Sequence, residues 1–159
     1  MAVRVIRTDD DPILRKKSRD VKEINDRMKE LIRDMFETMD EADGVGLAAP
    51  QVGILRRIIV IDDRESTRLA LINPEIIEKD GNEKGFEGCL SIPGRQGTVE
   101  RCTHVIVNYL DEDSNEKEIE ANDFLARILQ HEIDHLNGIL YTDRAVEMYE
   151  ITQEEGDIE

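Results

Sequence analysis

Two of the three histidines stand four positions apart, with a glutamate between them, in the run LQHEIDHLNG at residues 129–138. On a helix, residues four apart lie on one face, so His131 and His135 can bind one ion in common. Glu132 is rotated by about 100° from His131 and need not be a ligand. It can instead take a proton from a water molecule beside the ion. The pattern predicts a metal site with its own general base.

The ordinary alternative is a pair of surface or capped histidines, because helix faces also favour polar residues four apart. The placement of the pair favours the metal, since His131 and His135 continue an apolar stripe that we expect to face the core. Buried neutral imidazoles need polar partners, and a metal ion supplies one to both rings. Asp134, Asn137 or a backbone carbonyl is expected to orient the rings.

A third protein ligand is needed, and an acidic residue, His104 or a cysteine can supply it. His104 and Cys102 lie within a predicted regular strand, ERCTHVIV. For Cys102 we keep the ordinary role of a small buried hydrophobe. Cys89 stands in EGCLSIPG, where a break in a strand can turn a side chain into a cleft. The residues alone leave the choice of third ligand open.

The composition indicates one soluble domain spanning residues 1–159. The formal net charge of −16, from 37 acidic and 21 basic residues, argues against direct nucleic-acid binding. The longest apolar run, IIVI at 58–61, is far shorter than the roughly 20 residues that span a bilayer. Two cysteines do not make a disulfide framework, and the start of the chain has no secretory signal pattern. We expect a cytoplasmic monomer without membrane contact.

Periodicity predicts two helices. In residues 25–41 the apolar side chains are spaced 3, 1, 3, 1, 3 apart, with Asn25 as N-cap and Gly44 just past the end. The second helix covers residues 122–137, capped by Asn122 or Asp123 and ended by Gly138. The side chains expected to form its buried stripe are Phe124, Leu125, Ile128, Leu129 and Leu136.

Short strands are predicted between these helices, at residues 56–62, 68–73, 74–80, 84–94, 98–111 and 116–121. Residues 8–20, broken by Pro12, predict a loop, and the short acidic tail after Arg144 suggests one frayed helical turn or more. Because strands and helices do not alternate regularly, the expected class is α+β. We expect small antiparallel or mixed sheets packed around a central metal-binding helix, with a second helix near the N-terminus.

Three motifs together carry a family resemblance: GVGLAAPQ (44–51), EGCLS (87–91) and QHEIDH (130–135). In this order and separation they resemble the three motifs of peptide deformylases. Further similarity covers DDPILRKKS (10–18), NPEII (73–77) and HLNGILYTDR (135–144), so it spans most of the chain. This family hydrolyses the formyl group from the N-terminal formylmethionine of nascent bacterial and organellar proteins and releases formate. The resemblance therefore implies the same activity here.

The resemblance implies that Cys89, His131 and His135 bind one divalent metal ion. The ion is typically Fe²⁺ in the cell, and Zn²⁺, Ni²⁺ or Co²⁺ can take its place. Glu132 is then the general base and afterwards the general acid. A thiolate and two imidazoles leave one position open, as catalytic metal sites require.

Substrate contacts follow from the same resemblance. The Gln51 side-chain amide and the Leu90 backbone N–H would bind the formyl oxygen. Gly44 and Gly46 would let a peptide backbone approach and pair with the sheet edge beside Val45.

Phe124 and Ile128 precede the two histidines on the second helix and are expected to line the slot for the methionine side chain. Plain core packing is the alternative for both. The expected partners are nascent N-formyl-Met polypeptides, with a transient contact to the ribosome. The tail, VEMYEITQEEGDIE, is acidic and short, whereas many bacterial members carry a longer and often basic C-terminal helix, which argues against docking of this tail on ribosomal RNA.

Two other hypotheses compete with deformylation. One is a zinc endopeptidase of the H-E-x-x-H kind, with a third ligand other than Cys89. The second is a non-catalytic, closed site with four protein ligands, for which Cys102 or His104 would be the extra ligand.

Overall fold

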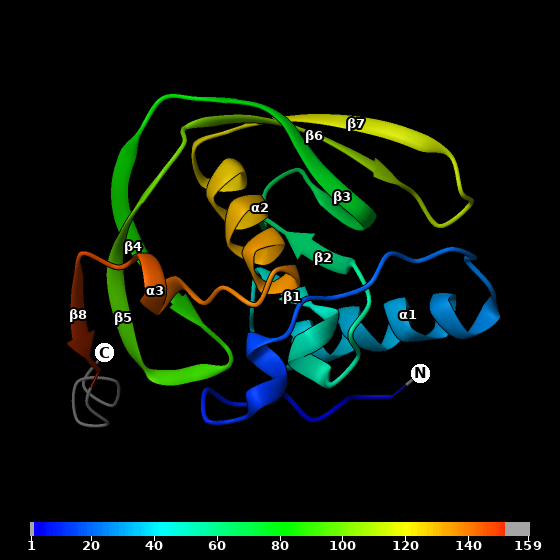
Figure 1. Ribbon diagram of the computed structural model, residues 1–159, viewed down its shortest axis with the longest axis horizontal. Coiled ribbons are helices and arrows are strands. Elements are labelled where there is room, and N and C mark those ends of the chain that lie inside the picture. Colours follow the sequence, from blue (N-terminus) through cyan, green and yellow to red (C-terminus); the bar gives the residue numbers. More distant parts are fainter. Residues whose placement is uncertain (1, 152–159) are drawn as a thin grey trace.

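The computed structural model describes residues 2–151 and places helix α2 (Asp123–Leu136) between two antiparallel sheets (Figure 1). Helix α1 (Asp26–Glu41) packs on the larger sheet. The remaining elements are η1 (Pro12–Arg15), β1 (Gly46–Ala48), η2 (Ala49–Val52), β2 (Ile58–Asp62), β3 (Arg68–Asp80), β4 (Glu83–Cys89), β5 (Ile92–Arg101), β6 (His104–Leu110), β7 (Glu116–Asn122), α3 (Tyr141–Arg144) and β8 (Glu147–Glu150). The predicted α+β class, with a central and an N-terminal helix, is confirmed.

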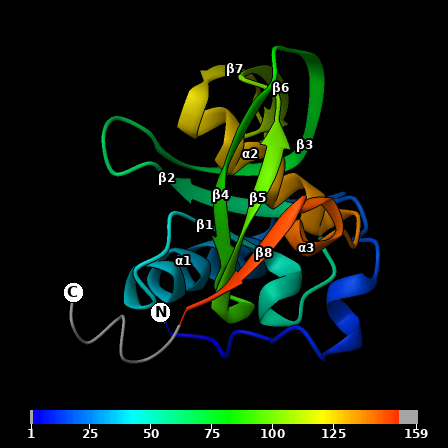
Figure 2. The same ribbon diagram turned by 90° about the vertical axis from the view of Figure 1, so that its left-hand side faces the viewer.

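The larger sheet has the strand order β1-β2-β3-β6-β7, and the smaller has the order β4-β5-β8 (Figure 2). Strand β1 is an edge of the larger sheet, and β4 is an edge of the smaller one. Residues from both edges line one pocket.

The apolar run of β2 explains how the two helices are held. Successive side chains of a strand point to opposite faces, so Ile58 and Val60 pack with the α1 side chains while Ile59 and Ile61 pack with those of α2. These four apolar side chains of β2 are fully buried. A strand covered on both faces is expected to be apolar throughout, as IIVI is.

Asn25 caps α1 as predicted, and its side chain accepts a hydrogen bond from the Met28 N–H at 3.0 Å. The two strands predicted at 68–73 and 74–80 are instead one strand, β3. Asn73, with a φ of 52°, and a nearby register shift carry β3 past the proline at 74.

The predicted strand 98–111 is in fact two strands, β5 and β6, which belong to different sheets. At the break, the Gln130 side chain accepts from the Cys102 N–H at 3.0 Å and donates to the Cys102 carbonyl at 2.8 Å. These bonds replace those that a neighbouring strand would make.

Three further predictions need correction. Residues 12–15 of the predicted loop form η1, because the Asp11 side chain caps it and Leu14 is fully buried. The tail after Arg144 forms strand β8 against β5 up to residue 150 and not a helical turn, while residues 152–159 lie outside the described part. Phe124 is not buried: it lies in the first turn of α2 and is 53% exposed.

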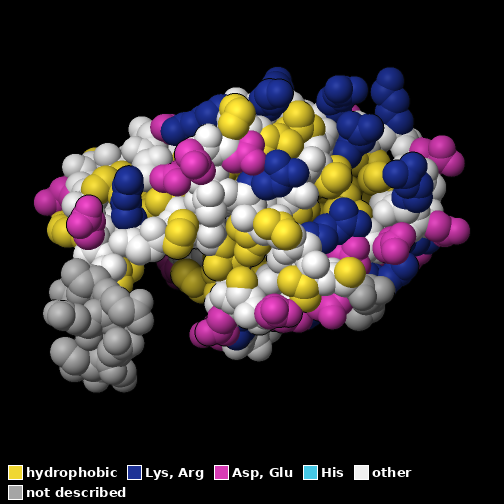
Figure 3. Space-filling model, turned by 90° about the horizontal axis from the view of Figure 1, so that it is seen from below, with side chains coloured by type: hydrophobic (Ala, Val, Ile, Leu, Met, Phe, Trp, Pro, Cys, Tyr) yellow, Lys and Arg dark blue, Asp and Glu magenta, His cyan; other side chains and the backbone are white. Residues whose placement is uncertain are grey.

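Charged side chains are spread unevenly over the surface. On the face in Figure 3, Lys and Arg gather mainly towards the upper right, Asp and Glu are scattered along the lower edge and at both ends, and hydrophobic side chains lie in the middle. The net charge of −16 is therefore not a uniform acidic coat. The absence of nucleic-acid binding, which rested on that net charge, stays a prediction.

Within residues 2–151, no helix combines the length and the apolar character that crossing a bilayer requires.

His104 should make stability depend on pH. Its Nε2 lies 2.7 Å from Glu120 Oε2, and this hydrogen bond, with nearby Asp80, raises its pKa in the folded state. A raised pKa stabilises the fold fully below the ordinary value of about 6.5, and this gain is lost as pH rises through the raised value. Urea unfolding should show His104→Gln losing more stability at about pH 5.5 than at about pH 8.5. Glu120→Gln should weaken this pH dependence, and a loss equal at both pH values would contradict it.

Candidate metal centre

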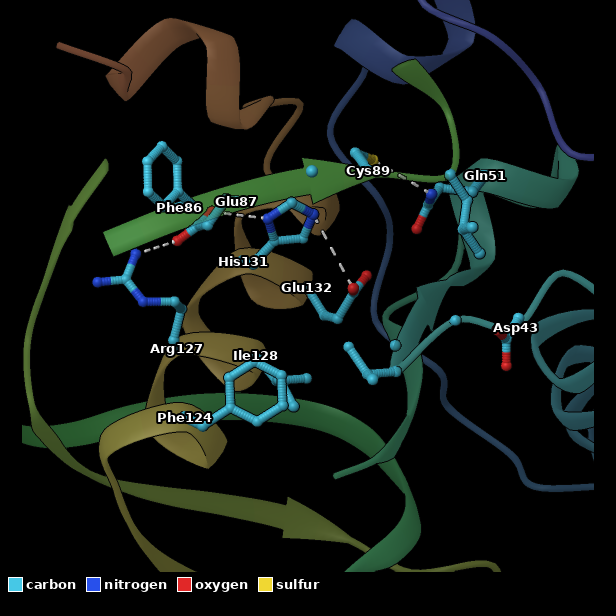
Figure 4. A pocket seen from close by; sticks show the side chains of 15 residues that line it. Asp43, Gln51, Phe86, Glu87, Cys89, Phe124, Arg127, Ile128, His131 and Glu132 are labelled. Atoms are coloured by element: carbon cyan, nitrogen blue, oxygen red, sulfur yellow. Dashed lines mark hydrogen bonds and ion pairs between the residues drawn. The ribbon is translucent and has the colours of Figure 1, made fainter. Parts of the chain in front are cut away.

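A pocket of about 380 Å³ opens between the two sheet edges, with α2 as its floor (Figure 4). One wall is formed by residues 43–46, which lead into β1, and the other by residues 86–90 of β4 and its following turn. The α2 residues that line the pocket are Phe124, Arg127, Ile128, His131 and Glu132. Segments far apart in sequence therefore meet around one cavity.

Three side chains at the end of this pocket form a group that can hold a metal ion. The ligand atoms of Cys89, His131 and His135 all lie within 4.8 Å of one another, and Cys89 Sγ is 3.3 Å from His135 Nε2. Nitrogen and sulfur donors around a tetrahedral zinc ion lie about 3.3–3.6 Å apart, so the donor set fits an ion of that size. Helix α2 supplies both imidazoles from one face, and the β4 end supplies the thiol.

The alternative third ligands lie elsewhere. His104 pairs with Glu120 on the larger sheet, and the Cys102 backbone is held by Gln130. Among residues 2–151, the Cys89 group is the one cluster of three or more His, Cys, Asp or Glu side chains with metal-binding geometry. The arrangement therefore lends no support to a four-ligand site that uses Cys102 or His104.

Glu87 orients His131, a role that our sequence analysis did not assign. Its Oε1 lies 2.8 Å from His131 Nδ1, which leaves Nε2 to face the other ligands (Figure 4). The expectation that Asp134 or Asn137 would orient the rings through side-chain contacts was wrong. Asp134 instead accepts from Arg101 and Arg144, and Asn137 accepts from Arg57. The sequence feature that could have indicated this role is the position of Glu87, two residues before Cys89 in EGCLS.

Glu87 is itself held by two arginines. Arg101 donates to it from Nε at 2.8 Å and from Nη2 at 2.9 Å, and Arg127 donates from Nη1 at 2.7 Å. Burial alone would raise the pKa of Glu87, but the hydrogen bonds with Arg101 and His131 outweigh it and lower the pKa. The carboxylate is therefore ionised and can accept from the His131 N–H.

The two ligand imidazoles differ in proton affinity. Burial opposes a charge on His131, yet hydrogen bonds to Cys89 and Glu87 raise its pKa well above the ordinary value. Burial and the neighbouring His131 charge lower the pKa of His135 well below that value. His131 therefore binds a proton far more readily than His135, and a metal cation can take the place of that proton.

Glu132 is buried beside this group. Burial raises its pKa to about 7, although His131 partly opposes the shift. Its Oε2 lies 4.0 Å from His131 Nε2, and its Oε1 has no hydrogen-bond partner within residues 2–151. A carboxyl group with a pKa near neutrality can both accept and return a proton.

Gln51 reaches the site from η2 and is 1% exposed. Its Oε1 accepts from the Ala48 N–H at 2.9 Å, and its Nε2 donates to Ser91 Oγ at 3.0 Å and lies 3.6 Å from Cys89 Sγ. Leu90 lies in the turn directly after Cys89 and lines the same pocket. The structure thus brings Gln51 and Leu90 next to the metal-binding group.

The sequence and the fold of this chain were compared with those of known proteins. The sequence model of the polypeptide deformylases matches residues 3–150. The chain belongs to the polypeptide deformylase family. It is 58% identical to the peptide deformylase of Alkaliphilus metalliredigens over 146 residues, which cover 92% of this chain and 99% of that protein. It is 57% identical to peptide deformylase 1 of Clostridium acetobutylicum over 147 residues, which cover 92% and 97%.

Solved structures of deformylases have the same fold. The crystal structure of the Thermotoga maritima peptide deformylase has a TM-score of 0.87 at 44% identity, with coverage of 90% of this chain and 97% of that one. The Synechococcus elongatus enzyme in complex with actinonin has a TM-score of 0.84 at 46% identity, with coverage of 88% and 79%. The predicted family and enzyme class are confirmed: the chain is a deformylase, a hydrolase that removes the N-formyl group from nascent polypeptides.

Glu87→Gln should weaken metal binding by this deformylase. Loss of the charged acceptor of His131 is expected to lower metal affinity by about 10–100-fold. Competition with a chromophoric chelator measures this. Asp134→Asn is the matched control, because it removes a carboxylate from Arg101 without touching His131. If both variants lose the same affinity, the orienting role of Glu87 is wrong.

Gly46→Ala should displace Glu132. A Cβ at position 46 would lie 2.5 Å from Glu132 Oε2, closer than van der Waals contact allows. We expect turnover to fall by at least about tenfold while bound metal is retained, because the base moves and the ligands do not. Gly88→Ala is the control, since its Cβ would meet Arg95 O at an ordinary 3.7 Å. Unchanged turnover in Gly46→Ala would show that Glu132 has room to adjust.

Proposed function

We propose that this pocket deformylates N-formyl-Met polypeptides with one divalent ion held by Cys89, His131 and His135. The observation that carries the proposal is the meeting of Cys89 with both histidines of HEIDH beside a pocket that is lined by Cys89, His131, Gln51 and Glu132. Thiolate and imidazole donors suit Fe²⁺, Zn²⁺, Ni²⁺ and Co²⁺. We propose Fe²⁺ as the ion in the cell, on the family resemblance.

Cys89, His131 and His135 would hold the divalent ion, which when bound would lower the pKa of a water molecule towards neutrality and so supply a nucleophile at neutral pH. Glu132 takes the proton of the attacking water and then gives a proton to the leaving amine. Its pKa of about 7 and its place 4.0 Å from His131 Nε2 support this role.

The negative charge that develops on the formyl oxygen needs fixed donors. We assign the Gln51 side-chain amide and the Leu90 backbone N–H to this task. Because Ala48 N–H holds Gln51 Oε1, the Nε2 end of the amide faces the site. Donors preorganised in this way are worth roughly 3 kcal/mol each in the transition state.

The substrate backbone is proposed to lie between the two sheet edges. Within residues 2–151, β1 and β4 are edge strands of their sheets, and residues at both edges line the pocket. An extended peptide is proposed to pair with the edge beside Val45, with Gly44 and Gly46 approached by its backbone. A side chain at either glycine would displace a pocket residue, since a Cβ at Gly44 would lie 2.8 Å from Leu90 Cδ1 and one at Gly46 would lie 2.5 Å from Glu132 Oε2.

Phe124 and Ile128 are proposed to line the slot for the methionine side chain. Both line the pocket, and they lie together at its α2 wall (Figure 4). The exposure of Phe124, which contradicts a core role, is what a pocket-lining residue needs.

We also propose that residues 1–159 form a single catalytic domain that acts as a monomer in the cytoplasm and contacts the ribosome only transiently. The supports are the length of the chain and its net charge of −16, which disfavours a lasting contact with RNA.

Two variants test the proposed chemistry. Glu132→Gln should lower formate release from a formyl-Met peptide by about 10²–10⁴-fold, because the general base is lost, and should keep its metal. Cys89→Ala should lose the metal, measured by elemental analysis of protein purified without oxygen. Full turnover by Glu132→Gln would overturn the base assignment. Metal retention in Cys89→Ala, or cleavage of internal peptide bonds, would favour the endopeptidase alternative.

A further inference from the structure

Ser91 has no place in the chemistry described so far, yet it is fully buried against the active site. It follows Leu90 in the two-residue turn between β4 and β5. Its Oγ lies 3.0 Å from Gln51 Nε2 and accepts a hydrogen bond from that amide. A buried hydroxyl is normally paired, and here its partner is the proposed donor to the formyl oxygen.

The Gln51 amide is held from both ends. Ala48 N–H donates to Oε1 at 2.9 Å, so a flipped amide would place two N–H groups against each other. The Nε2 end therefore faces Ser91 and Cys89. Gln51 is 1% exposed, so water does not compete for these contacts.

An amide nitrogen carries two hydrogens that diverge by about 120° in the amide plane. Ser91 Oγ accepts one of them at 3.0 Å, and the second is donated to Cys89 Sγ, 3.6 Å from Nε2. Cys89 belongs to the metal-binding group, so this second hydrogen points to that group. The serine oxygen thus sets the direction of the second hydrogen, which a formyl oxygen bound beside Cys89 would take over from the sulfur.

We propose that Ser91 is a positioning residue for deformylation: its Oγ holds one amide hydrogen of Gln51 so that the other points at the formyl oxygen. The inference rests on the donor role assigned to Gln51 under the proposed function. It makes residues 89, 90 and 91 one unit, in which a metal ligand, a backbone donor and the support of a second donor follow one another along a single turn.

The position of this turn explains why the support comes from residue 91. Cys89 pairs with Ile92 across the end of the β4–β5 ladder, so the two residues between them are fixed at both ends. A register shift between Glu87 and Cys89 turns this end of β4 towards α2. Cys89 and Ser91 therefore lie in one short closed turn, which places the serine hydroxyl and the metal-binding thiol on the same short piece of backbone.

A double-mutant cycle tests the proposal in the metal-loaded enzyme with a formyl-Met peptide. Ser91→Ala should lower kcat by about 10-fold with KM nearly unchanged, because a transition-state donor is misaligned while substrate binding is retained. In the Gln51→Ala background, Ser91→Ala should have almost no further effect on kcat. Ser18→Ala is the matched control, since it removes a buried hydroxyl whose Oγ has no hydrogen-bond partner within residues 2–151.

A second readout does not depend on activity. In the metal-free protein, the side-chain amide proton of Gln51 that faces Ser91 should shift upfield in the NMR spectrum of Ser91→Ala and stay in place in Ser18→Ala. Thermal unfolding and metal content complete the set. If Ser91→Ala unfolds or loses metal, Ser91→Thr keeps the hydroxyl and should retain more turnover than Ser91→Ala. An equal loss in both would contradict the proposal.

The outcomes separate this inference from the function on which it rests. If Gln51→Ala leaves kcat unchanged, the donor role of Gln51 fails, and the role of Ser91 fails with it. If Gln51→Ala lowers kcat but Ser91→Ala has no effect, or lowers kcat additively in both backgrounds, only the inference about Ser91 is overturned. Coupling of the two losses, with the NMR shift, supports it.

Discussion

The buried carboxylate of Glu87 is the interaction on which the site depends. It is paired with Arg101 and Arg127 and also accepts from His131, so it connects β4, β5 and α2. Buried charges are costly unless every partner is in place, and removing one partner from such a network typically costs about 3–5 kcal/mol. Asp134 extends the network by pairing with Arg101. The orientation of a metal-binding imidazole is therefore tied to the packing of the small sheet on the central helix.

Sequence reasoning predicted what depends on local spacing. The 3.6-residue period identified α1 and α2, the Asn25 cap was visible in the sequence, and the HEIDH motif predicted two histidines on one helical face. The sequence-based predictions were wrong where contacts between residues far apart in the sequence determine the local structure. Gln130 breaks the strand predicted at 98–111 by bonding the Cys102 backbone, and no local pattern shows that contact. For the same reason, Glu87 was visible only as an unexplained acid near Cys89.

The metal-binding histidines and the proposed general base lie on a well-packed helix, whereas the proposed substrate contacts lie on exposed sheet edges. Helix α2 is packed on several elements and supplies both imidazoles and Glu132, whose mutual positions are thereby fixed by helical geometry. Strands β1 and β4 are sheet edges within residues 2–151, and residues of both line the pocket. Exposed strand edges elsewhere would risk aggregation. Here they suit the extended peptide that we propose as substrate. Gly46 lies where the helix and the sheet edge meet, because its missing side chain lets Glu132 of α2 lie against β1.

The electrostatics of the pocket wall suit a substrate whose N-terminus has no charge. Arg127 lines the pocket, but its guanidinium donates to Glu87, to the Val99 carbonyl at 3.0 Å and to the Glu83 carbonyl at 2.8 Å. It therefore offers no free charge to a ligand. A formylated amine is neutral and loses little hydration energy on entering such a wall, whereas a free ammonium group would pay a large desolvation penalty. Pairing of Arg127 with Glu87 thus leaves neither of these two wall charges free to bind a charged chain end.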